Sequence, residues 1–276
     1  MTGARSDFTA TTLNDGRVLV TGGLTTEGVH ASAELYDPAT NAWTSAASMQ
    51  YARRSHSATL LANGKVLVVG GRDYYGMLVT AELYDPATDT WSEAGTLGAV
   101  RQLHGATELA NGKVLVVGGL SVGSLATANT EIYDPSTNTW TAVAPMATAR
   151  VFHTTTRLAN GKVLVAAGAN GSGAVASAEL YDPASNTWAP TGPMSGARQH
   201  HSATLLPNGK VLATGGDNTT GTVASTELYD PVSNVWAPAA TMATARQQGS
   251  ATLLSNGKVL VVDDHDGSNY VASAEL

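Results

Sequence analysis

The sequence predicts an all-β fold made of six copies of one unit, and three recurring features carry this prediction. An Asn-Gly or Asp-Gly turn returns every 48 or 49 residues, an apolar run follows each turn, and a Trp lies near the end of five copies. The turn glycines are Gly16, Gly64, Gly112, Gly161, Gly209 and Gly257. A fixed period of this length indicates a repeat architecture, so residues 1–276 are expected to form a single domain.

Each copy begins with two strands joined by the turn. In the second copy, "HSATLL" at His56–Leu61 is the first strand, and the Asn-Gly dipeptide after it favours a two-residue hairpin turn because both residues tolerate positive φ. The run "KVLVVGG" at Lys65–Gly71 is apolar at successive positions, which predicts a strand buried on both faces. The paired glycines then end this strand.

Two more strands complete each copy. "AELYDP" at Ala81–Pro86 ends in Asp-Pro, which opens a turn, and the strand after that turn carries the Trp. The Trp residues are Trp43, Trp91, Trp140, Trp188 and Trp236. Four antiparallel strands make a small sheet with two apolar faces that must stack on neighbours, and radial stacking of six such sheets predicts a β-propeller.

The paired glycines, the Tyr of the third strand and the Trp of the fourth, at this fixed spacing, resemble the kelch repeat over nearly the whole chain. The resemblance is to bacterial kelch propellers related to the central domain of galactose oxidase, and it implies a six-bladed kelch β-propeller. Galactose oxidase, sialic acid mutarotase and many interaction proteins share this fold, which therefore does not fix the function.

The sixth copy departs from the pattern. Six first and second strands are present but only five Trp strands, because Leu276 falls within the third strand of the sixth copy. We therefore expect six blades of four antiparallel strands, the last blade lacking its outermost strand. An exposed strand edge is a template for pairing with another chain, so the last blade predicts a route to self-association.

Composition excludes several classes of function. The chain has no Cys, which excludes thiolate metal sites, a Cys nucleophile and the Cys–Tyr cross-link that galactose oxidase chemistry needs, so no cofactor is expected. A net charge of −7 with 15 Lys and Arg argues against nucleic acid as a partner. No apolar run approaches the ~20 residues of a membrane helix, and no signal peptide precedes the first repeat, which favours a cytoplasmic location.

Residues that recur at one slot in every copy are expected to serve the scaffold. An Arg precedes each first strand and a Glu lies in each third strand, and their equal numbers predict Arg–Glu pairs, since a semi-buried charge needs a partner. The arginines are Arg5, Arg53, Arg101, Arg150, Arg198 and Arg246, and the glutamates are Glu34, Glu82, Glu131, Glu179, Glu227 and Glu275. A shared slot also holds His56, His104, His153 and His201, interpreted as polar packing at the start of the first strand.

Most polar and aromatic residues that do not recur fall at one end of the blades. In an antiparallel meander, that end carries the second-to-third-strand loops and the blade-to-blade links, and loops on a rigid scaffold concentrate function. Kelch relatives often bind ligands at this end, at the channel mouth, and use the Ser before the third strand, a slot that Ser177 and Ser225 match. The candidate ligand-binding residues are Asp7, Arg54, Arg72, Asp73, Tyr74, Phe152, Ser177, Ser225, Asp263 and Tyr270.

The sixth copy replaces Gly-Gly by Asp-Asp within "VVDDHDGSNY" at Val261–Tyr270. Carboxylates this close raise one another's pKa, which suits acid–base chemistry. The candidate catalytic residues are Asp264, Asp266, His265 and His200. A solvated loop in an incomplete blade and a metal site are the alternatives, although the spacing matches no calcium loop and no metal ligand is assigned.

Three functions remain open on the sequence. The first is a module that binds a small polar molecule, a sugar or a peptide at the channel mouth, where carboxylates, arginines and aromatic rings gather. The second is a cofactor-free enzyme for isomerisation, mutarotation or amine–carbonyl condensation, with the Asp/His cluster moving the proton. The third is an engineered or evolutionary propeller fragment with no ligand.

Overall fold

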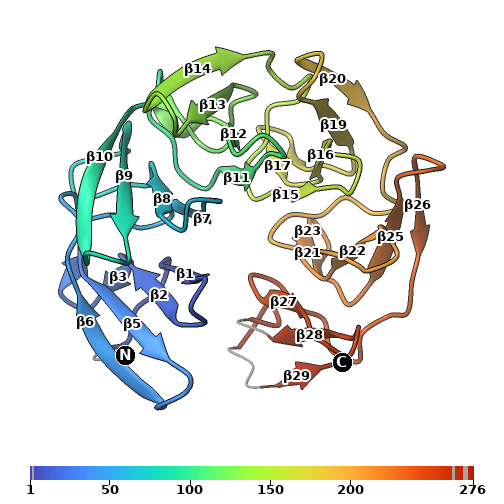
Figure 1. The fold of residues 1–276 in the computed structure, drawn as a ribbon. Coiled ribbons are helices and arrows are strands. Elements are labelled where there is room, and N and C mark those ends of the chain that lie inside the picture. The colour runs from blue at the N-terminus through green and yellow to red at the C-terminus, as the bar shows by residue number, and fades with distance from the viewer. Residues whose placement is uncertain (2, 263–264, 270–272) are drawn as a thin grey trace. The chain divides into compact units, whose positions relative to one another are not determined.

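The computed structural model describes residues 1, 3–262, 265–269 and 273–276, and its main sheets are the six blades of a β-propeller fold, three in each of two compact halves (Figure 1). Five blades are four-stranded antiparallel sheets and the sixth is three-stranded, as the sequence predicts. Helix among the described residues is limited to one 3-10 turn, η1 (Val122–Ser124), and none of it is long and apolar enough to cross a membrane.

The blades follow each other in chain order. Blade one is β1 (Thr9–Thr12), β2 (Val18–Thr21), β5 (Ala33–Asp37) and β6 (Ala42–Ala46); blade two is β7 (Ser57–Leu60), β8 (Val66–Val69), β9 (Thr80–Asp85) and β10 (Thr90–Thr96); blade three is β11 (Gly105–Glu108), β12 (Val114–Val117), β13 (Thr130–Asp134) and β14 (Thr139–Val143). Blade four is β15 (Thr154–Arg157), β16 (Val163–Ala166), β19 (Ala178–Asp182) and β20 (Thr187–Pro190); blade five is β21 (Ser202–Leu205), β22 (Val211–Thr214), β25 (Thr226–Asp230) and β26 (Val235–Pro238); blade six is β27 (Ser250–Leu253), β28 (Val259–Val262) and β29 (Ala274–Glu275). Short two-stranded ribbons in the second-to-third-strand loops are β3 (Leu24–Thr25) with β4 (Gly28–Val29), β17 (Ala169–Asn170) with β18 (Gly173–Ala174), and β23 (Asp217–Asn218) with β24 (Gly221–Thr222).

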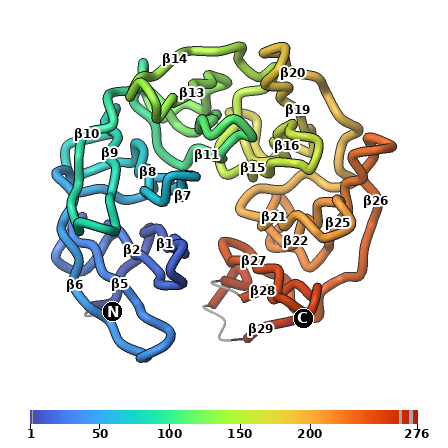
Figure 2. Tube along the Cα trace, viewed as in Figure 1, coloured from blue at the N-terminus to red at the C-terminus, as the bar shows by residue number. Residues whose placement is uncertain are grey.

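The chain forms two compact halves. The N-terminal half, residues 1–124 and 129–143, contains blades one to three, and the C-terminal half, residues 125–128 and 144–276, contains blades four to six. Within each half the first strands of consecutive blades lie side by side, as the Cα trace shows for β1, β7 and β11 and for β15, β21 and β27 (Figure 2).

The turn between the first and second strands is one residue longer than the sequence suggested. In blade two, Leu61 N donates to Lys65 O at 2.8 Å and Gly64 N donates to Leu61 O at 2.8 Å, which makes a three-residue loop. Only the glycine has positive φ, at 83° for Gly64, whereas a two-residue type I′ turn needs positive φ at both central residues. Asn63 instead uses its side-chain oxygen to accept from Lys65 N at 3.0 Å.

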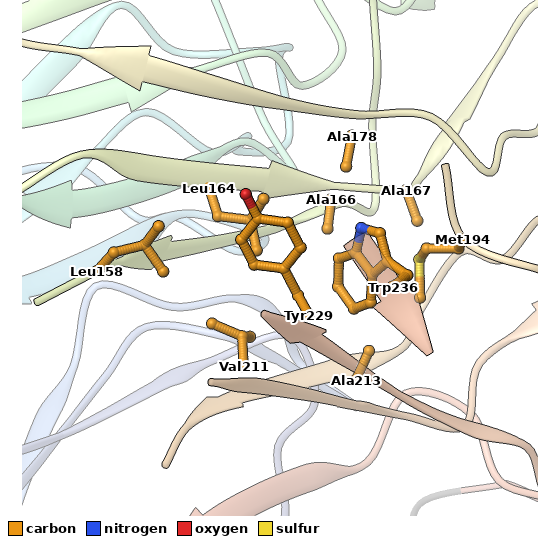
Figure 3. Packing of buried hydrophobic residues seen from close by; sticks show 10 residues of the cluster. All are labelled: Leu158, Leu164, Ala166, Ala167, Ala178, Met194, Val211, Ala213, Tyr229 and Trp236. Atoms are coloured by element: carbon orange, nitrogen blue, oxygen red, sulfur yellow. The ribbon is translucent and has the colours of Figure 1, made fainter. Parts of the chain in front are cut away.

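The core lies between neighbouring blades. The second strands β8, β12 and β16 are buried along their whole length, as their continuous apolar sequences predict. On the blade-five side of the interface with blade four, Tyr229 and Trp236 pack over Leu158, Leu164 and Met194 (Figure 3). Burying such aromatic side chains stabilises each interface by roughly 2–3 kcal/mol per ring.

The predicted Arg–Glu pairs are present in all six blades, with N–O distances between 2.5 and 2.9 Å. In blade four, Arg150 Nη2 lies 2.8 Å from Glu179 Oε1, and Arg150 Nη1 donates to Ala167 O at 2.7 Å. Glu179 also accepts from the link backbone, from Ala147 N at 2.7 Å and Thr148 N at 3.1 Å. Each pair therefore fixes the link that enters a blade against the third strand of that blade.

Candidate functional site

We call the end of the blades that carries the second-to-third-strand loops and the blade-to-blade links the link face, and the opposite end the turn face. On the link face the two kinds of segment are joined by single antiparallel bridges, such as Arg54 with Arg72 and Gln199 with Asp217. The bridging residue directly follows the buried Arg of the Arg–Glu pair. The scaffold therefore fixes the backbone of the link face tightly.

The next residue in each link adopts a left-handed backbone conformation. We call this position the left-handed slot, and φ lies between 53° and 62° at all six of its residues. They are Asp7, Ser55, Leu103, Phe152, His200 and Gln248. Backbone hydrogen bonds join consecutive slots, from Ser55 N to Asp7 O at 2.9 Å and Leu103 N to Ser55 O at 3.0 Å in one half, and from His200 N to Phe152 O at 3.2 Å and Gln248 N to His200 O at 2.9 Å in the other.

No glycine occupies the left-handed slot, although glycine alone adopts this conformation without strain. A side chain there costs roughly 1 kcal/mol, and residues held in such regions cluster at functional sites. Each slot residue lies two positions after the Arg of an Arg–Glu pair and, in four of the six links, directly before a His, yet the six slot side chains all differ. This combination marks the slot as a place where side-chain chemistry, and not the scaffold, sets the residue.

The C-terminal half contains the most connected cluster on the link face. His200 Nδ1 lies 2.7 Å from Asp217 Oδ1, and Gln199 Nε2 donates to Asp217 Oδ2 at 2.9 Å. The His200 ring also contacts the Phe152 ring, with 4.0 Å between centroids and 45° between planes. Phe152, Gln199, His200 and Asp217 are all half-buried, so their rings and polar atoms form a fixed surface that a ligand can reach.

The hydrogen-bond roles in this cluster follow from the carboxylate. An ionised Asp217 accepts only, so His200 carries its proton on Nδ1 and donates it to Asp217. In neutral His200 the Nε2 atom is then an acceptor. Asp217 therefore orients the imidazole, as an acid orients a histidine in many catalytic and binding sites.

In the N-terminal half the predicted residues Asp7, Arg54 and Arg72 come together. Arg54 Nη1 donates to Asp7 Oδ2 at 3.0 Å, and the backbones of Arg54 and Arg72 exchange hydrogen bonds at 3.0 and 2.9 Å. Asp73, by contrast, caps its own turn, because its Oδ1 accepts from Tyr75 N at 2.7 Å and from Gly76 N at 2.8 Å. Tyr74, 87% exposed, projects from this turn.

Blade one has a cavity of 340 Å³ on the link face, lined in part by Arg5, Glu27, His30 and Ser32. His30 Nε2 is 2.7 Å from Thr25 Oγ1, which holds the ring against the β3–β4 ribbon. The cavity belongs to the first blade alone and shares no lining residue with the His200 cluster.

Ser177 and Ser225 lie against buried arginines. Ser177 Oγ is 3.3 Å from Arg150 Nη2, and Ser225 Oγ is 3.0 Å from Arg198 Nη2. The same contact recurs at Ser32, Thr80 and Ser273 in other blades, so these hydroxyls take part in the scaffold hydrogen bonds around the Arg–Glu pairs. Their role as ligand contacts, which the kelch resemblance implies, stays a prediction.

His56, His104 and His201, three of the recurring histidines that were interpreted as polar packing, each contact the preceding blade. His56 Nε2 lies 2.9 Å from Thr9 Oγ1, and His201 Nε2 lies 2.9 Å from Thr154 Oγ1, in each case on the preceding blade. Burial, together with the nearby Arg53 or Arg198, lowers the pKa of His56 and of His201 to about 3. Both rings are therefore neutral at physiological pH.

The loop of blade six is described only in part. Asp263, Asp264 and Tyr270 lie outside the described residues. His265 Nδ1 accepts from Gly267 N at 2.9 Å, and Asp266 Oδ1 accepts from Ser268 N and Asn269 N at 2.8 Å each. These backbone hydrogen bonds lower the pKa of Asp266, the opposite of the rise expected for crowded carboxylates, so Asp266 acts here as a turn cap. Among the described residues, no three His, Asp or Glu side chains are placed to hold a metal ion.

Sequence reasoning missed part of this site. Ser55, Leu103 and Gln248 complete the left-handed slot, and Asp217 and Gln199 complete the His200 cluster. One signal was available, because each slot residue lies two positions after the recurring Arg and differs in every copy. The backbone conformation and the pairing of His200 with a residue 17 positions away were not readable from the repeat.

Comparison with known proteins agrees with this architecture. The sequence model of the Attractin/LZTR1 beta-propeller matches residues 2–179, and that of the kelch motif matches residues 200–243, which confirms the kelch resemblance. A solved chain described as "Structure of YjhT" superposes with a TM-score of 0.78 at 16% sequence identity, covering 98% of this chain and 93% of that one. No curated protein matches the chain. At 16% identity, the likeness to the solved structure concerns the fold alone.

Proposed function

We propose, from the premise that the chain belongs to the Attractin/LZTR1 β-propeller family, that this protein is a binding module. Its link face recognises a small polar molecule of the sugar class. The observation that carries this proposal is the left-handed slot, where six different side chains are held on a strained and otherwise uniform backbone. A scaffold without a ligand gains nothing from keeping side chains there, because glycine would relieve the strain.

The chemistry of the His200 cluster supports the ligand class. Both oxygens of Asp217 already accept hydrogen bonds from Gln199 and His200, so the carboxylate is partly neutralised and a free cation gains little from it. What remains open to a ligand is an aromatic surface, from Phe152 and His200, beside the Nε2 acceptor of His200. Aromatic faces with a few fixed polar groups suit a sugar, whose C–H face packs on rings while its hydroxyls form hydrogen bonds.

The test uses glycine substitutions, because glycine adopts the backbone conformation of the left-handed slot without strain. Phe152→Gly and His200→Gly remove a side chain at positive φ without straining the chain. Saturation-transfer NMR with the methyl glycosides of glucose, galactose and N-acetylglucosamine is expected to detect binding to the unmodified chain. The signal should fall at least about fivefold in either variant, since each removes a central contact of the surface.

The matched control is Asn186→Gly on the turn face of the same half. Asn186 has the same backbone conformation, with φ 54°. Its replacement by Gly removes the hydrogen bonds from the Tyr181 hydroxyl and from Ala144 N, so the variant shows what a loss of stability alone does to binding while the link face is unchanged. Binding that survives Asn186→Gly and disappears in the other two variants supports the proposal. Binding of a Lys-rich or Arg-rich peptide in place of every glycoside would overturn the sugar class, and no binding of either would favour a propeller without a ligand.

A cofactor-free enzyme is the second candidate, and one observation favours it. His200, oriented by Asp217 at 2.7 Å, has the arrangement of a general base with its Nε2 directed away from its partner. The proton acceptor of this alternative is His200, whereas Asp266 is occupied as a turn cap.

Exchange between the α and β anomers of free hexoses, followed by magnetisation transfer, separates the two candidates. An enzyme accelerates the exchange over buffer and loses the acceleration in His200→Gly and Asp217→Asn. A chain that binds glycosides but leaves the exchange rate of every hexose unchanged between pH 5 and 8, about the range in which histidines titrate, is a binding module only.

A further inference from the structure

The chain contains six Asn-Gly dipeptides, and one of them lies outside the repeat pattern. Five follow the first strands of blades two to six, on the turn face, and begin at Asn63, Asn111, Asn160, Asn208 and Asn256. The sixth, Asn170–Gly171, lies in the β17–β18 ribbon of blade four, on the link face. Asn-Gly is a dipeptide prone to deamidation, because glycine has no Cβ to shield its backbone nitrogen from the Asn side chain.

Deamidation of Asn-Gly requires a free backbone nitrogen on the glycine. This nitrogen gives up its proton and bonds to the side-chain carbon Cγ of the Asn, while the proton and the side-chain amide nitrogen leave as ammonia. Water then opens the resulting cyclic imide at either of its two carbonyls and yields aspartate or isoaspartate. A glycine N–H that donates to a carbonyl must first break its hydrogen bond, so such a site reacts only after a local opening of the chain.

The glycines of the five turn-face dipeptides all make such a hydrogen bond. In blade two, Gly64 N donates to Leu61 O at 2.8 Å. At 2.9 or 3.0 Å, the same bond to the Leu three residues earlier is made by Gly112, Gly161, Gly209 and Gly257. The five asparagines are exposed to solvent, yet the nitrogen that would attack each of them is held by the turn.

Gly171 differs from these five glycines. Asn170 faces Gly173 across the β17–β18 ribbon, so Gly171 and Ser172 form the loop of the ribbon. No hydrogen bond joins Gly171 N to any part of the chain that the structure describes. Asn170 Oδ1 accepts from Ser172 N at 2.8 Å, just as each turn-face Asn accepts from the Lys two residues later. The two kinds of site therefore share the contact of the Asn side chain and differ in the hydrogen bond of the glycine nitrogen.

We propose that Asn170 is the deamidation site of the folded chain and that the turn face protects the other five asparagines. Exposure alone would favour the opposite order, since Asn170 is half-buried and the other five are exposed. The reaction turns an amide into a carboxylate and so adds a negative charge to the link face. The new charge lies in a ribbon whose strand β18 contacts β23, the strand that carries Asp217. The assignment does not depend on the proposed function.

Peptide mapping of the chain of residues 1–276, after prolonged incubation at mildly alkaline pH, tests the proposal. Trypsin places the six dipeptides in six different fragments, because a Lys or Arg lies between each consecutive pair. The fragment with Asn170 is expected to gain the mass of deamidation at least about fivefold faster than each of the other five, and tandem mass spectrometry distinguishes Asn170 from Asn186 in that fragment. The same incubation in urea removes the hydrogen bonds, so the six sites should then react at similar rates.

Gly171→Ala is the matched variant. A Cβ at this position meets nothing within 4 Å and the φ of Gly171 is not left-handed, so the fold is retained. The added methyl group shields the backbone nitrogen and should slow deamidation of Asn170 both in the folded chain and in urea.

Amide hydrogen exchange gives a second measurement that needs no chemical reaction. The Gly171 amide should exchange as an unprotected amide, whereas Gly64 and its four counterparts should exchange more slowly. In the folded chain, deamidation of any turn-face Asn as fast as that of Asn170 would overturn the proposal. An Asn170 that stays intact while all six sites react in urea, or a Gly171 amide as protected as that of Gly64, would overturn it equally.

Discussion

Each residue of the left-handed slot combines a strained backbone with a side chain that differs from copy to copy. The neighbours explain how the strain is maintained, since the preceding bridge and the following blade-to-blade hydrogen bond both fix the peptide units around it. Phe152 and His200 gain a ring contact in return, and Asp7 gains an ion pair with Arg54. Under the proposed function, ligand recognition and local stability would oppose each other at this position.

Gln248 tests the backbone conformation alone, because its side chain is exposed. Gln248→Gly is expected to leave the free energy of unfolding unchanged or raise it by up to about 1 kcal/mol, because glycine adopts the φ of 62° without penalty. Gln248→Val should lower it by about 1–2 kcal/mol, since a β-branched side chain is poorly tolerated there. Urea denaturation measures both. Equal stabilities for the Gly and Val variants would show that the slot is not held in this conformation.

The buried histidines predict how stability depends on pH. The folded pKa of His56 and of His201, about 3, lies below the unfolded value of about 6.5, so between these values the unfolded chain binds a proton that the folded chain does not. Stability is therefore complete above pH 6.5 and falls as the pH is lowered, by up to about 1.4 kcal/mol per pH unit for each histidine.

Denaturation midpoints between pH 7 and pH 5 check this, in a range above most carboxylate titrations. His56→Gln and His201→Gln should each flatten the pH dependence, and the double variant should flatten it further. A pH dependence that is identical in all four chains would mean that neither histidine is buried in its neutral form.

At the scale of the element, the paired glycines after each second strand are needed for contact between segments. A Cβ atom added to Gly70 would lie 2.5 Å from Arg101 O of the next link. A Cβ atom added to Gly71 would lie 2.6 Å from Arg54 O of its own link. The two glycines therefore let the loop pass between two links on the link face. Ala167, with φ 55°, is the one described residue that replaces the first glycine of such a pair.

Two glycines of blade five allow the cost of positive φ to be measured separately from the cost of a steric contact with an added Cβ. Gly209 and Gly216 both have positive φ, at 80° and 97°, but a Cβ on Gly209 meets nothing within 4 Å, whereas one on Gly216 meets Gln199 O at 2.5 Å. Gly209→Ala should cost about 1 kcal/mol of unfolding free energy from backbone strain alone. Gly216→Ala should cost at least about 2 kcal/mol more, and should also disturb the Gln199–Asp217 contact in NMR spectra. Equal losses in urea denaturation would contradict the close approach.

At the scale of the whole molecule, the repeat predicts the architecture because each feature of it recurs. The six turn glycines, the second strands, the five Trp strands, the missing outer strand of blade six and the Arg–Glu pairs were all readable from aligned copies. Less of the candidate site could be predicted from the aligned copies, because its residues do not recur. Asp217 and Gln199 do not recur as a pair, and the sequence does not reveal that His200 occupies a left-handed backbone beside the Phe152 ring. Asp266, which does not recur either, caps its own turn, and its catalytic role stays a prediction.

The account depends most on the claim that the link face, through its left-handed slot, is the recognition surface. The most direct measurement is an amide chemical-shift map of the isotopically labelled chain during titration with the methyl glycoside that binds best. We predict that the largest changes fall on Phe152, His200, Gln248 and the loop at Asp217. Changes confined to the Asn-Gly turns of the turn face would contradict it.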